Sequence, residues 1–405
     1  MTLNSNSGSR AVLGIALMLI ITVGSGRIRA DTGTCGGVTT NLPFTDVMGS
    51  PFFCQIAEAF FSGLTNGTSA TTFSPTQNVT REQMAAFTTR TMDQSLKRGS
   101  RRAALKQFWT PTSEVGLGLT TVGTTPLLVE CDGADLWVPS NNSDTVSRVR
   151  ASDGKLLETW TGAVGASGVL AAKGLIFVIS SDDVPGKLYQ IDPTQPVGAV
   201  TTLPVTLGNR PSQISFDGAR IWTANLDASV SIVTLNPLSV TTVSAGFTTP
   251  TGILYDGANM WVTDAQGGVS FGKLFKLDSN GAITVTITVG NLPGFPVFDG
   301  MNIWVPNNTS NTVSVVRAST GSAFATLMGN GLSHPRCAAF DGERVLVTDS
   351  LVTPGVSLWK ASDLTPLGFV STGTGPGTIP FGACSDGLNF WVTLTSGGTG
   401  RLARF

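Results

Sequence analysis

The chain has 405 residues, a formal net charge of −1 and a single histidine. Residues 111–405 hold 15 Lys and Arg against 21 Asp and Glu, which gives this long region a net charge of −6. That charge excludes the region as an electrostatic match for nucleic acid. A single histidine excludes every mechanism that needs two, including paired-histidine metal sites and acid–base pairs.

Residues 1–30 predict a secretory signal peptide. Arg10 precedes an apolar run from Ala11 to Val23, and small and polar residues follow as far as Ala30. A basic start, a short apolar segment and a small final residue are typical of such peptides, and the run is short for a membrane span. We expect cleavage after Ala30, a secreted or cell-envelope protein, and no membrane span after cleavage. The alternative is an uncleaved N-terminal anchor.

Five cysteines are distributed unevenly along the chain. Cys35 and Cys54 lie close together near the N-terminus, and thiols of exported proteins tend to pair. We therefore predict a disulfide between them, which would stabilise a module with little core. Cys131, Cys337 and Cys384 precede Asp-Gly turns on predicted inner strands, where buried free thiols are expected.

Residues 31–95 predict a small helical module. Ser50 and Pro51 suit a helix start, as N-cap and first-turn residue respectively. The residues that follow place apolar side chains at helical spacing: Phe53, Ile56, Ala57, Phe60 and Phe61. After a turn-rich loop, a second helix is expected, with Thr80 as its N-cap and Gln83 as the capping-box partner.

This order of elements resembles the S-layer homology (SLH) motif. The matching residues are Phe44-Thr-Asp-Val47, Gly63, Gly67, Phe73-Ser-Pro75 and Val79-Thr-Arg81. In that family the motif anchors exported proteins to cell-wall polysaccharide, and the arginine of the Thr-Arg phrase contacts anionic, often pyruvylated, sugars. The resemblance therefore implies that Arg81, helped by Thr80, binds polysaccharide at a helix start.

Two features depart from the SLH pattern. The family phrase usually continues with Ala-Glu, whereas this chain has Glu82 and Gln83. Family members also commonly carry three copies that form one pseudo-threefold unit, and this chain has one copy. The single copy is expected to trimerise between chains or to act as a structural cap. For Arg81 the alternative to polysaccharide binding is a solvated or salt-bridged side chain.

Residues 96–112 predict a basic helical linker. Residues 81–110 hold seven Lys and Arg against two acidic residues, a net charge of +5. A solvated helix face is the usual meaning of such a run, and contact with an anionic polymer is the alternative. Pro111 is expected to end the helix.

Residues 113–405 contain a repeat marked by Asp-Gly, two further residues, an apolar residue and usually Trp-Val. The marker glycines are spaced by 41, 44, 39, 43, 42 and 45 residues and lie at positions 133, 174, 218, 257, 300, 342 and 387. A fixed period near 42 in a strand-rich chain predicts a mainly β fold, a seven-bladed β-propeller with four-stranded blades. The seventh unit lacks a fourth strand, so we expect residues 115–122 to pair with residues 400–405 and close the ring.

The chemistry of one repeat agrees with this fold. Asp-Gly accepts the positive φ angles of a tight hairpin, and the repeated Trp is expected to pack between blades rather than to bind a ligand. The repeat resembles seven-bladed YVTN and NHL-like propellers, and the streptogramin lyases share a similar Asp-Gly-x-x-Trp phrase. Such propellers host many functions, so the resemblance implies fold more than activity.

Polar residues that follow the second strands predict a ligand site at one mouth of the propeller channel. They are Asn141, Asn225, Asp264, Asn307 and Asp349, joined by Arg210, His334 and Arg336 from the loops that lead into the blades. A calcium ion or a small ligand is the functional interpretation, and turn hydrogen bonds made by Asn and Asp are the alternative. No other cofactor, metal cluster or catalytic residue is predicted.

Two functions remain open from the sequence. The first is a non-catalytic envelope protein, whose SLH-like module binds cell-wall polysaccharide or other envelope proteins and whose propeller serves as a binding platform. The second is an extracellular enzyme of the lyase or lactonase type that uses carboxylates at the channel mouth. The single histidine favours the first.

Overall fold

The computed structural model describes residues 30–35, 38–61, 65–88, 118–268, 270–373, 375, 377–395, 398 and 400–405. The chain divides into two compact units, Met1–Ser100 and Arg101–Phe405, and each is considered by itself. The predicted signal peptide, apart from Ala30, and the predicted linker lie outside the described residues. Among the helices that are described, none is long and apolar enough to span a membrane.

The N-terminal unit contains a β-hairpin as well as helices. Strands β1 (Asp31–Cys35) and β2 (Val38–Leu42) pair antiparallel and precede helix α1 (Phe53–Phe61), and residues 81–88 form a further helix. The two expected helices are present, and the hairpin is an element that the sequence did not predict. Its Thr- and Gly-rich sequence has no alternation of apolar and polar residues, so the usual strand signal is missing.

A small apolar core and one disulfide hold the N-terminal unit together. The fully packed residues are Leu42, Phe44, Val47, Phe53, Ile56 and Ala57. Cys35 of β1 is bonded to Cys54 of α1, as predicted, with a Cα–Cα distance of 5.5 Å. The buried carboxylate of Asp31 accepts hydrogen bonds from Val47 N at 2.7 Å and Met48 N at 2.8 Å. Hairpin, loop and helix are thus joined by covalent, apolar and polar contacts.

The C-terminal unit is the predicted seven-bladed propeller, described here blade by blade. In each of the seven four-stranded sheets the strands pair antiparallel. Blades 1 to 4 comprise β4 (Glu130–Cys131), β5 (Asp135–Ser140), β6 (Thr145–Arg150), β7 (Leu156–Thr161); β8 (Ala166–Ala172), β9 (Leu175–Ser180), β10 (Leu188–Ile191), β11 (Thr201–Thr202); β12 (Pro211–Phe216), β13 (Ile221–Asn225), β14 (Ser229–Leu235), β15 (Leu238–Val243); and β16 (Pro250–Tyr255), β17 (Met260–Asp264), β18 (Phe271–Leu277), β19 (Ile283–Asn291).

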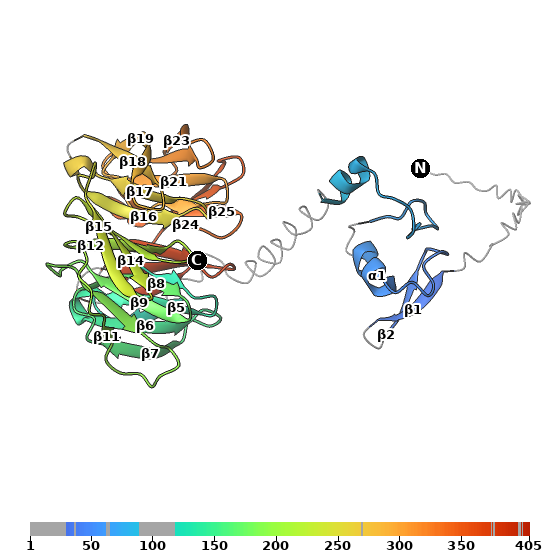
Figure 1. Cartoon of the computed structure of the whole chain (residues 1–405), viewed down its shortest axis with the longest axis horizontal. Helices are drawn as coiled ribbons and strands as arrows, with labels where there is room; N and C mark the ends of the chain where they lie inside the picture. Colours follow the sequence, from blue (N-terminus) through green and yellow to red (C-terminus); the bar gives the residue numbers. More distant parts are fainter. Residues whose placement is uncertain are drawn as a thin grey trace, which may run out of the picture. The chain divides into compact units, whose positions relative to one another are not determined.

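The remaining blades complete and close the ring. Blades 5 to 7 comprise β20 (Val297–Phe298), β21 (Asn302–Asn307), β22 (Thr312–Arg317), β23 (Ser322–Met328); β24 (Pro335–Phe340), β25 (Arg344–Asp349), β26 (Gly355–Lys360), β27 (Pro366–Ser371); and β28 (Ile379–Ser385), β29 (Phe390–Thr395), β30 (Gly400–Arg404) with β3 (Leu119–Val122). Strand β3 pairs antiparallel with β30, from Leu119 opposite Ala403 to Val122 opposite Gly400. This confirms the predicted closure, and in Figure 1 the red C-terminal strands return to the teal strands of the first blades.

The Asp-Gly-x-x-x-Trp phrase forms one hydrogen-bonded unit in five blades. In blade 4, one oxygen of Asp256 accepts from the backbone N–H groups of Ala258 and Asn259, and the other accepts from Trp261 Nε1 at 2.7 Å. Gly257 has φ of +93°, as the turn requires. The same bond from the indole to the turn carboxylate occurs in blades 1, 3, 5 and 7, at Trp137, Trp222, Trp304 and Trp391. The Asp therefore closes the hairpin and also satisfies a buried indole.

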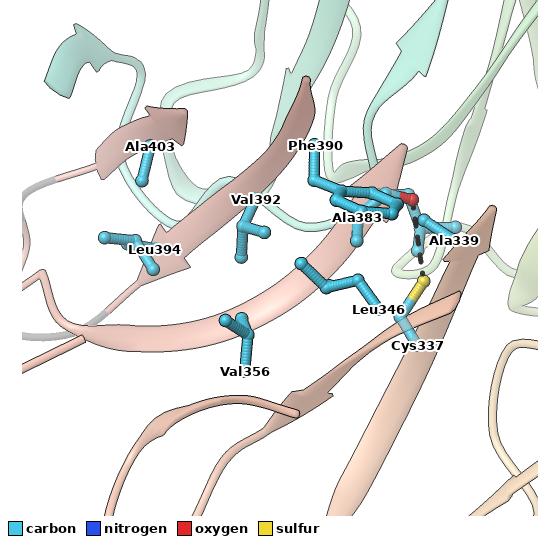
Figure 2. Packing of buried hydrophobic residues seen from close by; sticks show 10 residues of the cluster. Cys337, Ala339, Leu346, Val356, Ala383, Phe390, Val392, Leu394 and Ala403 are labelled. Atoms are coloured by element: carbon cyan, nitrogen blue, oxygen red, sulfur yellow. Dashed lines mark hydrogen bonds between the residues drawn. The ribbon is translucent and has the colours of Figure 1, made fainter. Parts of the chain in front are cut away.

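Apolar side chains of neighbouring sheets form the cores between blades. The five tryptophans of these units are fully buried, which agrees with a packing role. Figure 2 shows one such core, in which residues of blade 6 (Cys337, Leu346 and Val356) pack against residues of blade 7 (Ala383 and Phe390). Each blade therefore depends on its neighbours for burial, as in other radially repeated folds.

Candidate functional site

The start of the second helix in the N-terminal unit carries the residues predicted to bind polysaccharide. Thr80 caps the helix, because its Oγ1 accepts from Gln83 N at 3.1 Å while its own N–H donates to Gln83 Oε1 at 2.9 Å. This reciprocal pair is a capping box. Arg81 is the first helical residue, and its side chain is exposed.

Arg81 makes no ion pair with any described residue. Its guanidinium is therefore free for an external anion, and the salt-bridged alternative finds no partner in the described part of the chain. The first turn of the helix adds unpaired backbone N–H groups and a positive end of the helix dipole. Charge and donors of this kind, gathered at a helix start, suit an oxyanion.

Two loops in front of this helix are fixed to each other by Asp46. Its carboxylate accepts from Phe73 N at 2.9 Å and from Ser74 N at 2.7 Å. The ring of Phe44 packs against Phe60 and Phe73, with centroid distances of 5.2 and 5.5 Å. The phrases Phe44-Thr-Asp-Val47 and Phe73-Ser-Pro75 thus form one structural unit that leads into the helix at Arg81.

The predicted mouth residues Asn225 and Asn307 lie fully buried inside their own blades. Asn225 Nδ2 donates to the hydroxyls of Ser229 and Ser231, both at 3.0 Å. Asn307 Nδ2 donates to Thr312 Oγ1 and to Ser314 Oγ, again at 3.0 Å. Each amide joins the end of the second strand to the third strand, so its donors are used by the scaffold.

Asp264 and Asp349 are also fully buried, and they hold the loops that lead into their blades. Asp264 accepts from the backbone N–H groups of Thr248 and Thr249 at 2.8 and 2.9 Å. Asp349 accepts from Ser333 N at 3.0 Å and from Ser357 Oγ at 2.6 Å. Burial raises the pKa of Asp349 to about 7, although these hydrogen bonds act in the opposite direction.

The three predicted loop residues differ in their surroundings. Arg210 is exposed, and His334 is half-buried with an Nδ1 atom that has no hydrogen-bond partner in the described part of the chain. Arg336 is exposed, its guanidinium lies 5.2 Å from the ring centroid of Phe381, and its Nε donates to Ser350 Oγ at 2.9 Å. The surrounding protein desolvates this guanidinium and lowers its pKa.

The first strands of six blades surround a central cavity of about 250 Å³. Glu130 of β4 lies on its wall, and burial together with the charge of Asp132 raises the pKa of Glu130 to about 7. Sequence reasoning missed this carboxyl. The signal was present, because the equivalent position, two residues before the turn Asp, is Leu254, Val297 or Ala339 in other blades.

The three remaining cysteines also line this cavity, and all are free thiols. Cys337 is buried and donates to Ala383 O at 3.8 Å (Figure 2), and burial raises its pKa to about 12. Burial raises the pKa of Cys131 as well, and that of Cys384 well above its ordinary value. Thiols of this kind are weak nucleophiles at neutral pH.

The described residues contain no group of three or more His, Cys, Asp or Glu side chains placed to hold a metal ion. The carboxylates named for calcium, Asp264 and Asp349, belong to different blades, and each is used by backbone and hydroxyl donors of its own blade. These two carboxylates therefore do not come together as a shared pair of calcium ligands in the described part of the chain.

The two units are similar to different known proteins. The S-layer homology domain family matches residues 43–85, which include Thr80 and Arg81. The N-terminal unit carries an SLH domain. Such domains generally bind cell-wall polysaccharides, so the domain indicates a cell-envelope or surface protein, and the disulfide fits a location outside the cytoplasm. No curated protein matches the chain.

The propeller is similar in fold to several solved structures. A streptogramin B lyase structure has a TM-score of 0.56 and 14% identity, covering 71% of this chain and 96% of that one. Hydrazine synthase of Kuenenia stuttgartiensis has a TM-score of 0.57 and 16% identity, covering 71% and 98%. Virginiamycin B lyase from Staphylococcus aureus has a TM-score of 0.55 and 14% identity, covering 70% and 98%. At these identities the likeness shows the fold alone.

Proposed function

We propose that this chain is a non-catalytic cell-envelope protein. Its SLH domain binds an anionic cell-wall polysaccharide through Arg81 and the helix start capped by Thr80, and its propeller serves as a binding platform. The observation that carries the proposal is an exposed arginine, unpaired within the described residues, at the helix start of a matched SLH domain.

The chemistry of this helix start supports a carboxylate- or phosphate-bearing sugar. A planar guanidinium donates two parallel hydrogen bonds to such a group. The capping box holds the backbone of Thr80 and Gln83 in place, so the first N–H groups of the helix are oriented before any ligand arrives. A preformed site loses less conformational entropy on binding.

The buried state of the mouth carboxylates supports a platform rather than a lyase- or lactonase-like enzyme. Asp264 and Asp349 have no exposed surface, and their oxygens accept hydrogen bonds from the loops of their own blades. A general base must reach the proton that it removes. In the described conformation neither carboxylate is placed to do so.

The ligand side of the proposal is tested with modified cell walls. Purified protein is co-sedimented with intact sacculi and with sacculi from which the covalently attached anionic polysaccharide has been stripped. We expect retention on the first and loss of retention on the second, with added salt weakening the retention. Equal retention on both would contradict binding to the polysaccharide and would indicate binding to peptidoglycan or no specific binding.

A further inference from the structure

Arg336 differs from three of the arginines that stack on aromatic rings in the propeller and resembles Arg317, which lies over Phe324 without an ion pair to a described residue. Arg148, Arg220 and Arg344 each lie over a ring and also form an ion pair, with Asp135, Asp217 and Asp341 respectively. Arg336 lies over the ring of Phe381 and has no carboxylate partner among the described residues. Its charge is therefore not neutralised by the part of the propeller that the structure describes.

Arg336 lies between two neighbouring blades. It lies on β24, the first strand of blade 6, and its backbone oxygen accepts from Phe295 N of the preceding blade at 2.8 Å. Phe381 belongs to β28, the first strand of the following blade. First strands line the central cavity. The next residue, Cys337, lines that cavity, so Arg336 lies beside the cavity near the start of its strand, with solvent at its exposed surface.

Two aromatic rings and one hydroxyl group lie near the guanidinium of Arg336. The half-buried rings of Phe295 and Phe381 lie 5.8 Å apart between centroids. Ser350 Oγ accepts from Arg336 Nε and donates to His334 O at 3.0 Å, so the hydroxyl fixes the base of the guanidinium to the loop. Nη1 and Nη2 form no hydrogen bond with the described residues, so both remain available as donors.

Arg336 is exposed to solvent, and no carboxylate among the described residues neutralises its charge. Such a charge is typical of a site that a ligand completes, particularly beside apolar surface. We propose that Arg336 binds the carboxylate or phosphate of a small organic anion beside the central cavity, while the apolar body of that ligand packs on Phe295 and Phe381. The inference gives the proposed platform a ligand class. It rests on that part of the proposed function and is independent of wall anchoring.

The nearby charges are compatible with an anion. The lowered pKa of Arg336 has desolvation as its cause and includes no contribution from a carboxylate. Glu130 lies on the cavity wall on β4, a different first strand, and its own raised pKa reduces its negative charge at neutral pH. The same unpaired cation disfavours calcium near this position, since two like charges repel.

The test uses the whole chain and two simple anions, benzoate and phenyl phosphate, in isothermal titration calorimetry. Benzamide, which has the shape of benzoate and no charge, is the ligand control. We expect saturable binding of at least one anion with millimolar affinity or better, and no measurable binding of benzamide. Benzoate and phenyl phosphate distinguish a carboxylate site from a phosphate site. Failure of both anions to bind, or equal binding of benzamide, would overturn the proposal.

Variants locate the site. Arg336→Gln is expected to weaken anion binding at least tenfold, because a charge-assisted hydrogen bond is lost. Phe381→Leu is expected to weaken it less and equally for both anions. Arg220→Gln removes an arginine that has a carboxylate partner and lies over Trp222, and is expected to leave binding unchanged. Loss of binding in Arg220→Gln as large as in Arg336→Gln would place the site elsewhere.

Sedimentation with sacculi separates this proposal from wall anchoring. Arg336→Gln is expected to sediment with sacculi as the unmodified chain does, because the SLH domain is unchanged. Absent anion binding with normal sedimentation would refute the channel site and leave the anchor intact.

Discussion

The SLH domain and the propeller differ in how their polar residues are used. In the SLH domain, Thr80 and Arg81 are exposed at a helix start, and the fold leaves the guanidinium free of partners among the described residues. In the propeller, the most regular polar residues are buried and bonded inside single blades, as at Asn225 and Asp264. The polar residues that recur from blade to blade therefore act in folding. Candidate chemistry lies where the repeat is broken, as at Glu130 and Arg336.

The first prediction tests whether the regular residues act in folding. Trp261→Ala is expected to lower the free energy of unfolding by about 3–5 kcal/mol, because a fully buried indole leaves a cavity. Urea denaturation of the whole chain measures this. Phe271→Ala, at a side chain that is 65% exposed, is the control and should change stability by less than about 0.5 kcal/mol. Equal effects of the two changes would contradict the packing role of the Trp.

The second prediction concerns the SLH domain, whose small core depends on one disulfide. Cys35→Ser together with Cys54→Ser is expected to destabilise this domain by about 3 kcal/mol, from the entropy of the chain that the bond closes. Limited proteolysis should then cleave the N-terminal unit while the propeller stays resistant. Cleavage of both units at the same rate would contradict their independence.

The third prediction uses the raised pKa of Asp349. Its pKa of about 7 in the folded state exceeds the value of about 4 expected in the unfolded chain, so the folded state holds the proton more tightly. The resulting stability is fully present below about pH 4 and is lost as the pH rises through 7. Asp349→Asn, which places the residue of Asn225 and Asn307 at this position, should be more stable than the unmodified chain at pH 8 by roughly 2–4 kcal/mol, where the upper figure is a shift of three pKa units at about 1.4 kcal/mol each.

Melting curves of both proteins between pH 5 and pH 8 measure this difference. The advantage of Asp349→Asn should shrink as the pH is lowered toward 5, where the carboxyl is protonated in the unmodified chain. An advantage that is independent of pH would show that the carboxyl does not titrate in this range. Glu130 has a similar pKa, so the variant should keep part of the pH dependence.

The fourth prediction has the smallest expected effect on stability and tests the hydrogen bond from the indole of Trp261 to the carboxylate of Asp256. Asp256→Asn keeps the size of the side chain and the acceptor for the turn, and it removes the carboxylate oxygen that accepts from Trp261. We expect a loss of about 1–2 kcal/mol, because a buried N–H loses its acceptor. In the variant Trp261→Phe the same substitution at Asp256 should cost less, and a double-mutant cycle measures the difference. If the effects of the two substitutions on the free energy of unfolding simply add, Asp256 and Trp261 do not form one hydrogen-bonded unit.

Much of the propeller was predictable because its turns are local. Asp-Gly marks six of the seven hairpins within a few residues, Lys173-Gly174 marks the other, and the missing fourth strand of blade 7 left residues 115–122 as its partner, as observed for β3. The SLH helices and the capping box at Thr80 were predictable for the same reason. In each case the residues that predict the element are the same few neighbouring residues that form it.

The sites were less predictable, because burial depends on neighbouring blades. A strand end at Asn225 suggested a channel mouth, and the structure shows that its amide is used inside the blade. Glu130 was overlooked because one strand alone does not reveal the cavity that six blades create. The hairpin β1–β2 was missed because its polar sequence has no strand pattern. Whether the mouth residues bind a ligand remains a prediction, and among the described residues the guanidinium groups of Arg210 and Arg336 keep available donors.

The affinity of the protein for cell-wall sacculi, with and without Arg81, tests the central claim most directly. Binding isotherms would compare the unmodified chain with Arg81→Ala, Arg81→Lys and Lys155→Ala, an exposed cation on the propeller. We predict at least a tenfold loss for Arg81→Ala, a smaller loss for Arg81→Lys because lysine lacks the planar fork, and no change for Lys155→Ala. An affinity for sacculi that is unchanged in Arg81→Ala would contradict the account.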